Sequence, residues 1–93
     1  MVHRERMYRL SKTARIAGSS DSSVLLDTKR GRFYSLSPTA RQICERIADG
    51  ASFQVTLDVI QKQYTAPRER IASDLEEFLS VLTRLGLCHV NEI

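Results

Sequence analysis

The 93-residue chain has no tryptophan, only two cysteines and two prolines, and four glycines. Two cysteines are too few for a disulfide scaffold, and the glycines are isolated, which excludes a glycine-rich phosphate loop. The longest strongly apolar run, Val24-Leu25-Leu26, falls far short of the roughly 20 residues of a membrane helix. No apolar stretch follows the charged first residues as it would in a signal peptide. We therefore expect a cytoplasmic protein with no membrane partner.

Hydrophobic residues make up 42% and charged residues 27% of the sequence, an ordinary composition for one soluble globular domain. The net charge of +3 is unevenly distributed. Residues 1–36 contain eight Lys or Arg against three Asp or Glu, whereas residues 37–93 contain six against eight. A basic first half indicates either a surface for a charged partner or an ordinary solvated surface.

Three short strands are predicted, over residues 13–17, 23–28 and 32–36. The Gly-Ser-Ser-Asp cluster at 18–21 marks the first turn, and Gly31 lies in the second, where a positive φ would be needed. Residues 1–12 are polar and are predicted to form a flexible lead-in. The folded domain is expected to span residues 13–90.

Three helices are predicted to follow the strands. Ser37, Ser52 and Pro67 mark their starts, and Gly50 and Gly86 end the first and third. Apolar residues recur at helical spacing in each; in the third helix they are Ile71, Leu75, Phe78, Leu82 and Leu85. The predicted fold is α+β and winged-helix-like, a three-stranded antiparallel sheet followed by three helices.

Residues that carry catalysis or hold metals are few. Cys44 lies in the apolar stripe of the first helix, which indicates a buried core thiol. Cys88 and His89 are adjacent in an expected extended tail, so they point to opposite faces and are poorly placed to share a metal. His3 and His89 are the only histidines, and neither is in a pattern typical of a catalytic triad. We therefore predict no enzyme activity, no metal and no cofactor.

Two binding functions fit the predicted fold. A winged helix that binds DNA could use Lys29-Arg30-Gly31-Arg32 as its wing. The third helix disfavours this, because its acidic residues outnumber its basic ones and a recognition helix lies among phosphates. The alternative is peptide docking, since the third strand ends the sheet and presents unpaired N–H and C=O groups.

A set of short motifs resembles a known family, and their order and spacing carry the likeness. They are Val24-Leu25-Leu26-Asp27, residues 31–37 (GRFYSLS), Thr39-Ala40 with Ile43, Asp49-Gly50, Tyr64, Asp74-Leu75 and residues 82–87 (LTRLGL). Over about residues 13–90 the chain resembles the pyrroloquinoline-quinone synthesis protein D family, the precursor peptide recognition element of ribosomally made, modified peptides (RiPPs). The turn Thr28-Lys29-Arg30-Gly31 and the absence of tryptophan make it most similar to the stand-alone leader-binding protein of lasso-peptide clusters.

This resemblance implies a function in peptide maturation. The leader of a precursor peptide would add as an antiparallel strand to the third strand, with its side chains in the groove toward the third helix. A separate cysteine-protease-like leader peptidase would then receive the leader, and a cyclase would close the ring of the lasso peptide. Neither nucleic acid nor a membrane is expected as a partner.

The resemblance also implies a set of leader-binding residues. These are Arg32, Phe33, Tyr34, Ser35 and Leu36 in the third strand. In the third helix they are Arg70, Asp74, Glu77 and Val81 on one flank, and Phe78 in the core direction beside it. The opposite flank is expected to contain Ala72 and Leu79. Asp74 and Glu77 are either attractors of a basic leader residue or ordinary solvent-facing charges. The sequence leaves open which alternate residues of the third strand pair outward.

Overall fold

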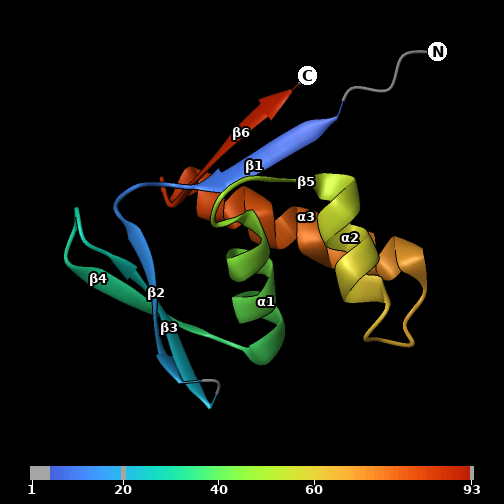
Figure 1. Cartoon of the computed structure of the whole chain (residues 1–93), viewed down its shortest axis with the longest axis horizontal. Helices are drawn as coiled ribbons and strands as arrows, with labels where there is room; N and C mark the ends of the chain where they lie inside the picture. Colours follow the sequence, from blue (N-terminus) through green and yellow to red (C-terminus); the bar gives the residue numbers. More distant parts are fainter. Residues whose placement is uncertain (1–4, 20, 93) are drawn as a thin grey trace.

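The computed structural model describes residues 5–19 and 21–92 of the chain (Figure 1). Its elements are β1 (Arg6–Leu10), β2 (Ala14–Ser19), β3 (Ser22–Asp27), β4 (Arg32–Leu36), α1 (Pro38–Ile47), β5 (Ala51–Ser52), α2 (Phe53–Gln61), α3 (Arg68–Arg84) and β6 (Cys88–Glu92). The strands form two antiparallel three-stranded sheets, ordered β5-β1-β6 and β2-β3-β4. The predicted α+β class is confirmed. Among the described residues, no helix has the length and apolarity needed to cross a membrane.

The β2-β3-β4 sheet is the meander predicted from the sequence. Leu25 of β3 is fully buried, and its register partner Tyr34 of β4 packs against the same core. Leu36 packs on that face as well, whereas Phe33 points away and is 69% exposed. Tyr34 and Leu36 therefore share one face of β4 and Phe33 takes the other, as side chains alternate along a strand.

The predicted helix starts at Ser37 and Ser52 are confirmed by their capping geometry. The Ser37 hydroxyl accepts a hydrogen bond from the Ala40 N–H at 3.1 Å, and the Ser52 hydroxyl accepts one from the Val55 N–H at 3.1 Å. Each bond satisfies a helix N–H that has no partner within its helix. The caps fix where the chain leaves β4 to begin α1 and leaves β5 to begin α2.

The β5-β1-β6 sheet was not predicted. The expectation of a flexible lead-in over residues 1–12 is wrong for residues 6–10, which form the central strand β1. Tyr8 and Leu10 are buried, and Arg6 donates to Glu76 of α3 at 2.7 Å while its guanidinium stacks over Phe53. Of the same lead-in, residues 1–4 lie outside the described residues. The predicted extended tail near residues 87–90 is observed as β6.

The buried face of α3 differs from the predicted stripe by one position. Leu79, expected on a flank, is fully buried, together with Ile71, Leu75 and Leu82. Phe78, expected in the core, is half-buried at the edge of that core. Because Leu79 takes the buried position, Phe78 lies on the side of α3 that bounds an apolar cavity.

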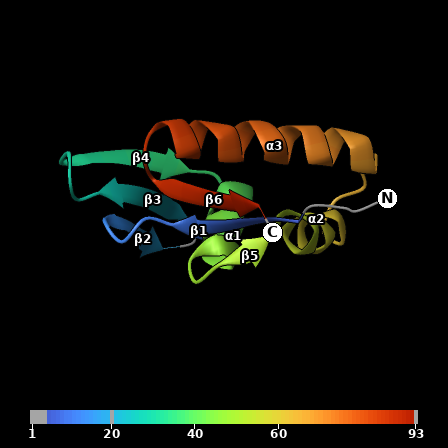
Figure 2. The same cartoon turned by 90° about the horizontal axis from the view of Figure 1, so that it is seen from above.

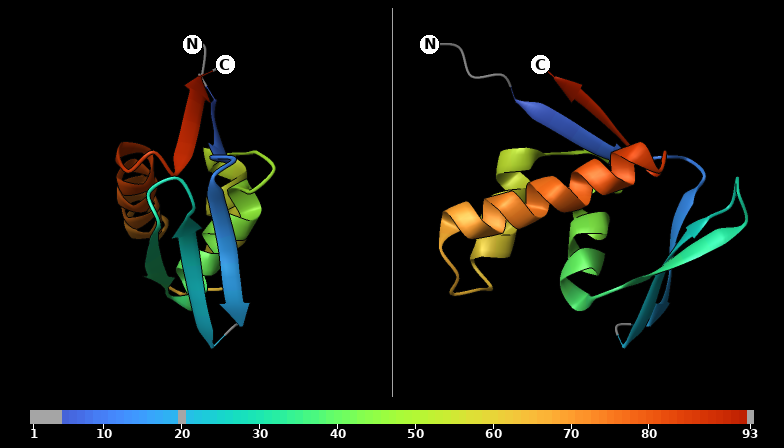
Figure 3. Two further views of the ribbon diagram at one scale, coloured as in Figure 1. Left: turned by 90° about the vertical axis from the view of Figure 1, so that its left-hand side faces the viewer. Right: turned by 180° about the vertical axis from the view of Figure 1, so that it is seen from behind.

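Two layers lie on either side of the β1–β6 ribbon. Figure 2 shows α3 and β4 along one side of the molecule, and α2 and β5 along the other. Figure 3 gives the same arrangement from the end and from behind. The outer strand of the meander, β4, and the longest helix, α3, thus lie on the same side of the molecule.

Candidate functional site

The outer edge of β4 is the first component of the candidate site. Within the described residues, β4 pairs with β3 alone, so its other side presents backbone groups without a strand partner. In an antiparallel strand, the N–H and C=O of one residue point to the same side, and successive residues alternate. The hydrogen bonds of β3 therefore determine which residues of β4 point outward.

The alternation in β3 is fixed by the bonds at its end. The Thr28 N–H donates to the Thr13 carbonyl at 2.9 Å, toward the β2 side of the sheet. The neighbouring Asp27 carbonyl accepts from the Gly31 N–H at 2.8 Å, toward the β4 side. Because this direction alternates along the strand, the odd-numbered residues of β3, Asp27 among them, hydrogen-bond to β4.

The register transfers this alternation to β4. The odd-numbered residues Asp27, Leu25 and Ser23 lie opposite Arg32, Tyr34 and Leu36, respectively. Arg32, Tyr34 and Leu36 therefore bond to β3. Phe33 and Ser35 are the residues whose N–H and C=O groups point out of the sheet, which answers the question that the sequence left open.

The second component is an apolar cavity of about 430 Å³ next to the end of β4. Its lining comes from the segment after β4 and from all three helical regions: Ser37, Thr39, Ala40, Ile43, Ile60, Tyr64, Ala66, Arg70, Ile71, Asp74, Leu75 and Phe78. The buried members form an apolar floor, and the charged side chains of Arg70 and Asp74 are exposed at its rim. An apolar floor with a few polar groups at its edge is suited to holding an apolar side chain.

The loop between α2 and α3 closes one wall of this cavity. Tyr64, which is 41% exposed, is hydrogen-bonded through its hydroxyl to Thr39 in the first turn of α1. This bond ties the loop to the helix that begins directly after β4. The cavity therefore lies next to the residues that directly follow β4.

The structure brings together some of the predicted site residues and separates others. Arg70, Asp74 and Phe78 of α3 line the cavity, whereas Glu77 and Val81 are not part of its lining. The five predicted β4 residues form the edge and its inner face but do not line the cavity. Sequence reasoning missed the contributions of α1 and of Tyr64 and Ala66, although Tyr64 was singled out as a motif residue.

A buried carboxylate fixes the turn that precedes β4. Asp27 is 1% exposed and accepts hydrogen bonds from the N–H groups of Lys29 and Arg30, both at 3.1 Å. The Arg30 guanidinium lies 3.2 Å from the other Asp27 oxygen and also donates to the Leu85 carbonyl at the end of α3 at 3.2 Å. The turn is thereby joined to α3, which holds β4 in place relative to the helix.

These contacts make the fold sensitive to acid. Burial alone would raise the pKa of the Asp27 carboxyl, but the bonds from the Arg30 N–H and guanidinium, with the Arg30 charge and the Lys29 N–H, outweigh it and hold that pKa below its ordinary value. The Arg6 hydrogen bond likewise lowers the pKa of Glu76. Because both folded-state pKa values are lowered, their stabilisation is present above about pH 4 and is lost as the pH falls further.

We predict that the melting temperature is nearly constant from pH 7 to 5 and falls steeply below about pH 4. Asp27→Asn should flatten this fall, because an amide does not titrate, whereas Asp58→Asn, on the surface pair with Arg68, should leave its shape unchanged. Differential scanning calorimetry from pH 7 to 2.5 measures the three curves. Equal steepness in wild type and Asp27→Asn would contradict this role of Asp27.

A contact between Ser11 and His89 is structural rather than catalytic. The buried Ser11 hydroxyl donates to the Gly86 carbonyl at 2.6 Å and lies 3.2 Å from Nε2 of His89. Since its single proton is directed to the carbonyl, the hydroxyl can only accept from His89, and the imidazole cannot act as its general base. Within residues 5–19 and 21–92, no cluster of three His, Cys, Asp or Glu side chains is fit to hold a metal.

Both cysteine thiols are buried. Cys44 is fully buried and Cys88 is 1% exposed. Burial raises the pKa of Cys44 to about 12, and it also raises the pKa of Cys88. At pH 8 only roughly one Cys44 side chain in ten thousand would be the reactive thiolate.

We therefore predict that iodoacetamide at pH 8 modifies neither cysteine in the folded protein and both in denaturant. Intact-mass spectrometry over time measures the two adducts. Cys44→Ala, which removes only a core sulfur, should retain the fold and any binding at the β4 edge. Rapid alkylation of a single cysteine in the native protein would show that one thiol is accessible and activated.

The chain is similar to known proteins in sequence and in fold. The model of the family described as coenzyme PQQ synthesis protein D (PqqD) matches residues 22–87. A search of curated protein sequences gave no match. The chain is similar to the solved structure of TbiB1 in complex with the TbiA(beta) leader peptide, with 25% identity, a TM-score of 0.79 and coverage of 87% of this chain and 94% of that one.

A second similar structure is lasso peptide synthetase B1 complexed with the leader peptide. It is 26% identical, has a TM-score of 0.76, and the match covers 88% of this chain and 96% of that one. The family match spans most of the meander, the three helices and the turn after α3, and so contains both the β4 edge and the cavity. The chain therefore belongs to the PqqD family, as a RiPP recognition element of the PqqD type.

Proposed function

We propose that this protein binds the leader segment of a ribosomally made precursor peptide as a strand added to the outer edge of β4. The observation that carries the proposal is the outward backbone of Phe33 and Ser35 next to an apolar cavity. The two similar structures support it, since both are described as leader-peptide complexes. Peptide addition to a sheet edge uses main-chain bonds for affinity and side-chain pockets for specificity.

The direction of the added strand follows from the antiparallel geometry. A peptide antiparallel to β4 begins beside the end of β4, where Ser37 lines the cavity, and ends beside the turn at Gly31. Its first residues would thus place an apolar side chain in the cavity. Arg70 and Asp74 at the rim would contact flanking polar groups, and Phe78 would contact the apolar side chain. Glu77 and Val81 continue the α3 face beyond the cavity.

We propose that the bound leader is then presented to a separate cysteine-protease-like peptidase, with a cyclase completing a lasso peptide in the cytoplasm. This protein would contribute no chemistry of its own. Holding the leader raises the effective concentration of the cleavage site near the peptidase, which accelerates cleavage without a new catalytic group.

Fluorescence anisotropy tests the proposal with labelled leader peptides. The probes are the TbiA(beta) leader and the leader of a short precursor encoded beside the gene for this protein. We expect saturable binding that changes little with salt, because strand pairing releases few counterions, and slower exchange of the Phe33 and Ser35 amides with solvent deuterium. A DNA duplex should bind weakly and with a steep salt dependence. Tight, sequence-selective DNA binding with no leader affinity would contradict the proposal.

A further inference from the structure

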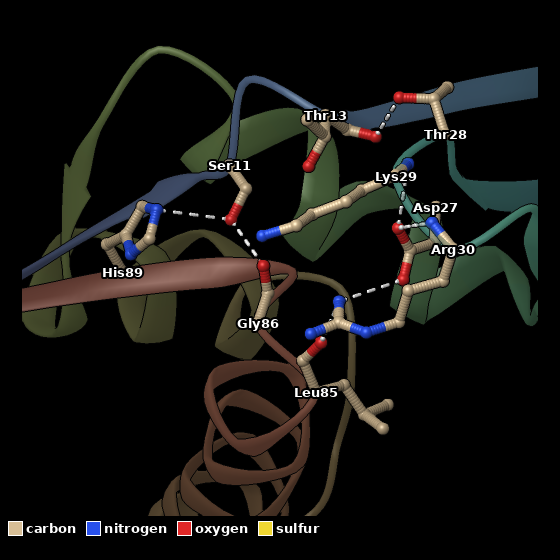
Figure 4. Close-up of polar contacts among 9 residues, drawn as sticks. All are labelled: Ser11, Thr13, Asp27, Thr28, Lys29, Arg30, Leu85, Gly86 and His89. Atoms are coloured by element: carbon tan, nitrogen blue, oxygen red, sulfur yellow. Dashed lines mark hydrogen bonds and ion pairs between the residues drawn. The ribbon is translucent and has the colours of Figure 1, made fainter.

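A second cavity, of about 740 Å³, lies at the opposite end of β4 from the apolar one. It is bounded by the segment between β1 and β2, by the turn before β4 and by the residues that follow α3. Figure 4 shows the Lys29 side chain extending from that turn toward Ser11 and Gly86. Five cationic side chains line this cavity against one acidic one, Asp49; they are Arg9, Lys12, Arg15, Lys29 and Arg30. We call it the basic cavity.

Three of these cations have no counter-ion in the part of the chain that the structure describes. Arg30 is paired with Asp27, and Arg9 donates to the Asp49 carbonyl at 3.1 Å. The exposed side chains of Lys12, Arg15 and Lys29 take part in none of the hydrogen bonds or ion pairs among the described residues. Their charges are available to an external anionic group.

The walls of the basic cavity are held by hydrogen bonds between its segments. Ser11 is 7% exposed, and its N–H donates to the Leu87 carbonyl at 2.9 Å while its hydroxyl donates to the Gly86 carbonyl. The Thr28 hydroxyl and N–H both donate to the Thr13 carbonyl, at 2.8 and 2.9 Å, which joins the two sides of the opening (Figure 4). The cations are thus presented on a fixed frame, and a ligand would not have to order it on binding.

We propose that the basic cavity binds acidic side chains in the part of the precursor peptide that follows the segment docked on β4. This rests on the proposed function, since an antiparallel peptide leaves β4 at the turn that carries Lys29 and Arg30. The charge of the cavity complements glutamate or aspartate. Its concave shape suits single carboxylate side chains rather than the continuous backbone of a DNA duplex. The apolar cavity would select a side chain in the first part of the docked segment. The basic cavity would select acidic side chains in the part of the precursor that follows the docked segment.

The test uses two labelled peptides that share the TbiA(beta) leader's docked segment and continue as four glutamates or four glutamines. With wild-type protein in 50 mM NaCl, the glutamate peptide should bind about fivefold more tightly, as a few partly exposed ion pairs provide. In Lys12→Gln/Lys29→Gln this preference should fall below about twofold. The glutamine peptide should bind wild type and variant equally, because the β4 edge is unchanged.

The control is Arg46→Gln/Lys62→Gln, which removes the same charge from exposed positions outside the basic cavity. It should retain the fivefold preference. Equal binding of both peptides by wild type, or an equal loss of preference in the two double variants, overturns the proposal while leaving leader binding intact. Failure of the glutamine peptide to bind wild type overturns the proposed function, and this assignment with it. Tight duplex binding that is lost only in Lys12→Gln/Lys29→Gln would assign the basic cavity to nucleic acid instead.

Discussion

Replacing Ser35 with proline should remove leader binding and leave the fold intact. The Ser35 N–H points away from β3, so its loss breaks no bond of the meander, and proline is tolerated on the outer side of an edge strand. A docked peptide would lose one main-chain bond and meet the proline ring. One unmade bond costs about 1–3 kcal/mol, so we expect affinity to fall by about fivefold to 150-fold. Leader titration by anisotropy and far-ultraviolet circular dichroism measure the two effects.

The neighbouring residue supplies the contrast. Tyr34→Pro removes an N–H that bonds to β3 and should lower the melting temperature strongly, with Tyr34→Ala accounting for the lost side chain. Ser35→Ala should bind leader like wild type, since the exposed hydroxyl is not part of the pairing. Phe33→Pro belongs to the outward class and should behave like Ser35→Pro. If folded Ser35→Pro and Phe33→Pro both bind leader normally, the leader does not pair with β4.

Gly18→Ala should destabilise the protein more than a methyl group added at any of its other glycines. Gly18 has a φ of +86°, and a Cβ there would lie 2.0 Å from the carbonyl oxygen of Ser22 across the hairpin. The backbone conformation alone costs an alanine about 1–2 kcal/mol, and the overlap with a rigid carbonyl must be relieved by separating β2 from β3. Urea unfolding measures the change in the free energy of unfolding.

Gly31→Ala is the matched control. Gly31 has a similar φ of +68°, but a Cβ there would meet no atom within 4 Å. We expect only the conformational cost of about 1–2 kcal/mol, and at least twice that for Gly18→Ala. Equal losses in the two variants would mean that the hairpin relaxes to accept the Gly18 methyl group at no cost.

The meander and the helices could be predicted because their signals are local. Alternating apolar residues, the two serine caps and the glycines at the turns each act within a few residues. The β5-β1-β6 sheet could not be predicted in the same way. Strand β1 pairs with β6 from the other end of the chain, and no local pattern reports a partner so distant. Arg6, whose guanidinium stacks over Phe53, also gives β1 a polar sequence.

The candidate site was predictable only in part. That β4 is an edge strand follows from the strand order. Which of its alternate residues point their backbone groups away from β3 depends on the turn geometry, and the Thr28 and Gly31 bonds determine it. On α3, the helical repeat allows either Phe78 or Leu79 to face the core, and the packing of α2 and β6 against α3 decides for Leu79. The cavity needed Tyr64 and Ala66, loop residues whose placement no periodic pattern encodes.

The pairing of β1 with β6 has a practical consequence for how this protein can be connected to others. Arg6 and Glu92 are opposite each other in the register, so β1 starts and β6 finishes at one corner of the molecule, away from β4 (Figures 1 and 3). A dye, an affinity tag or a whole enzyme attached directly before β1 or directly after β6 would extend from that corner rather than from the β4 edge. For the same reason a short linker between β1 and β6 can close the chain into a ring. The β4 edge would thus keep one orientation relative to an attached catalyst, whichever of these two strands carries the link.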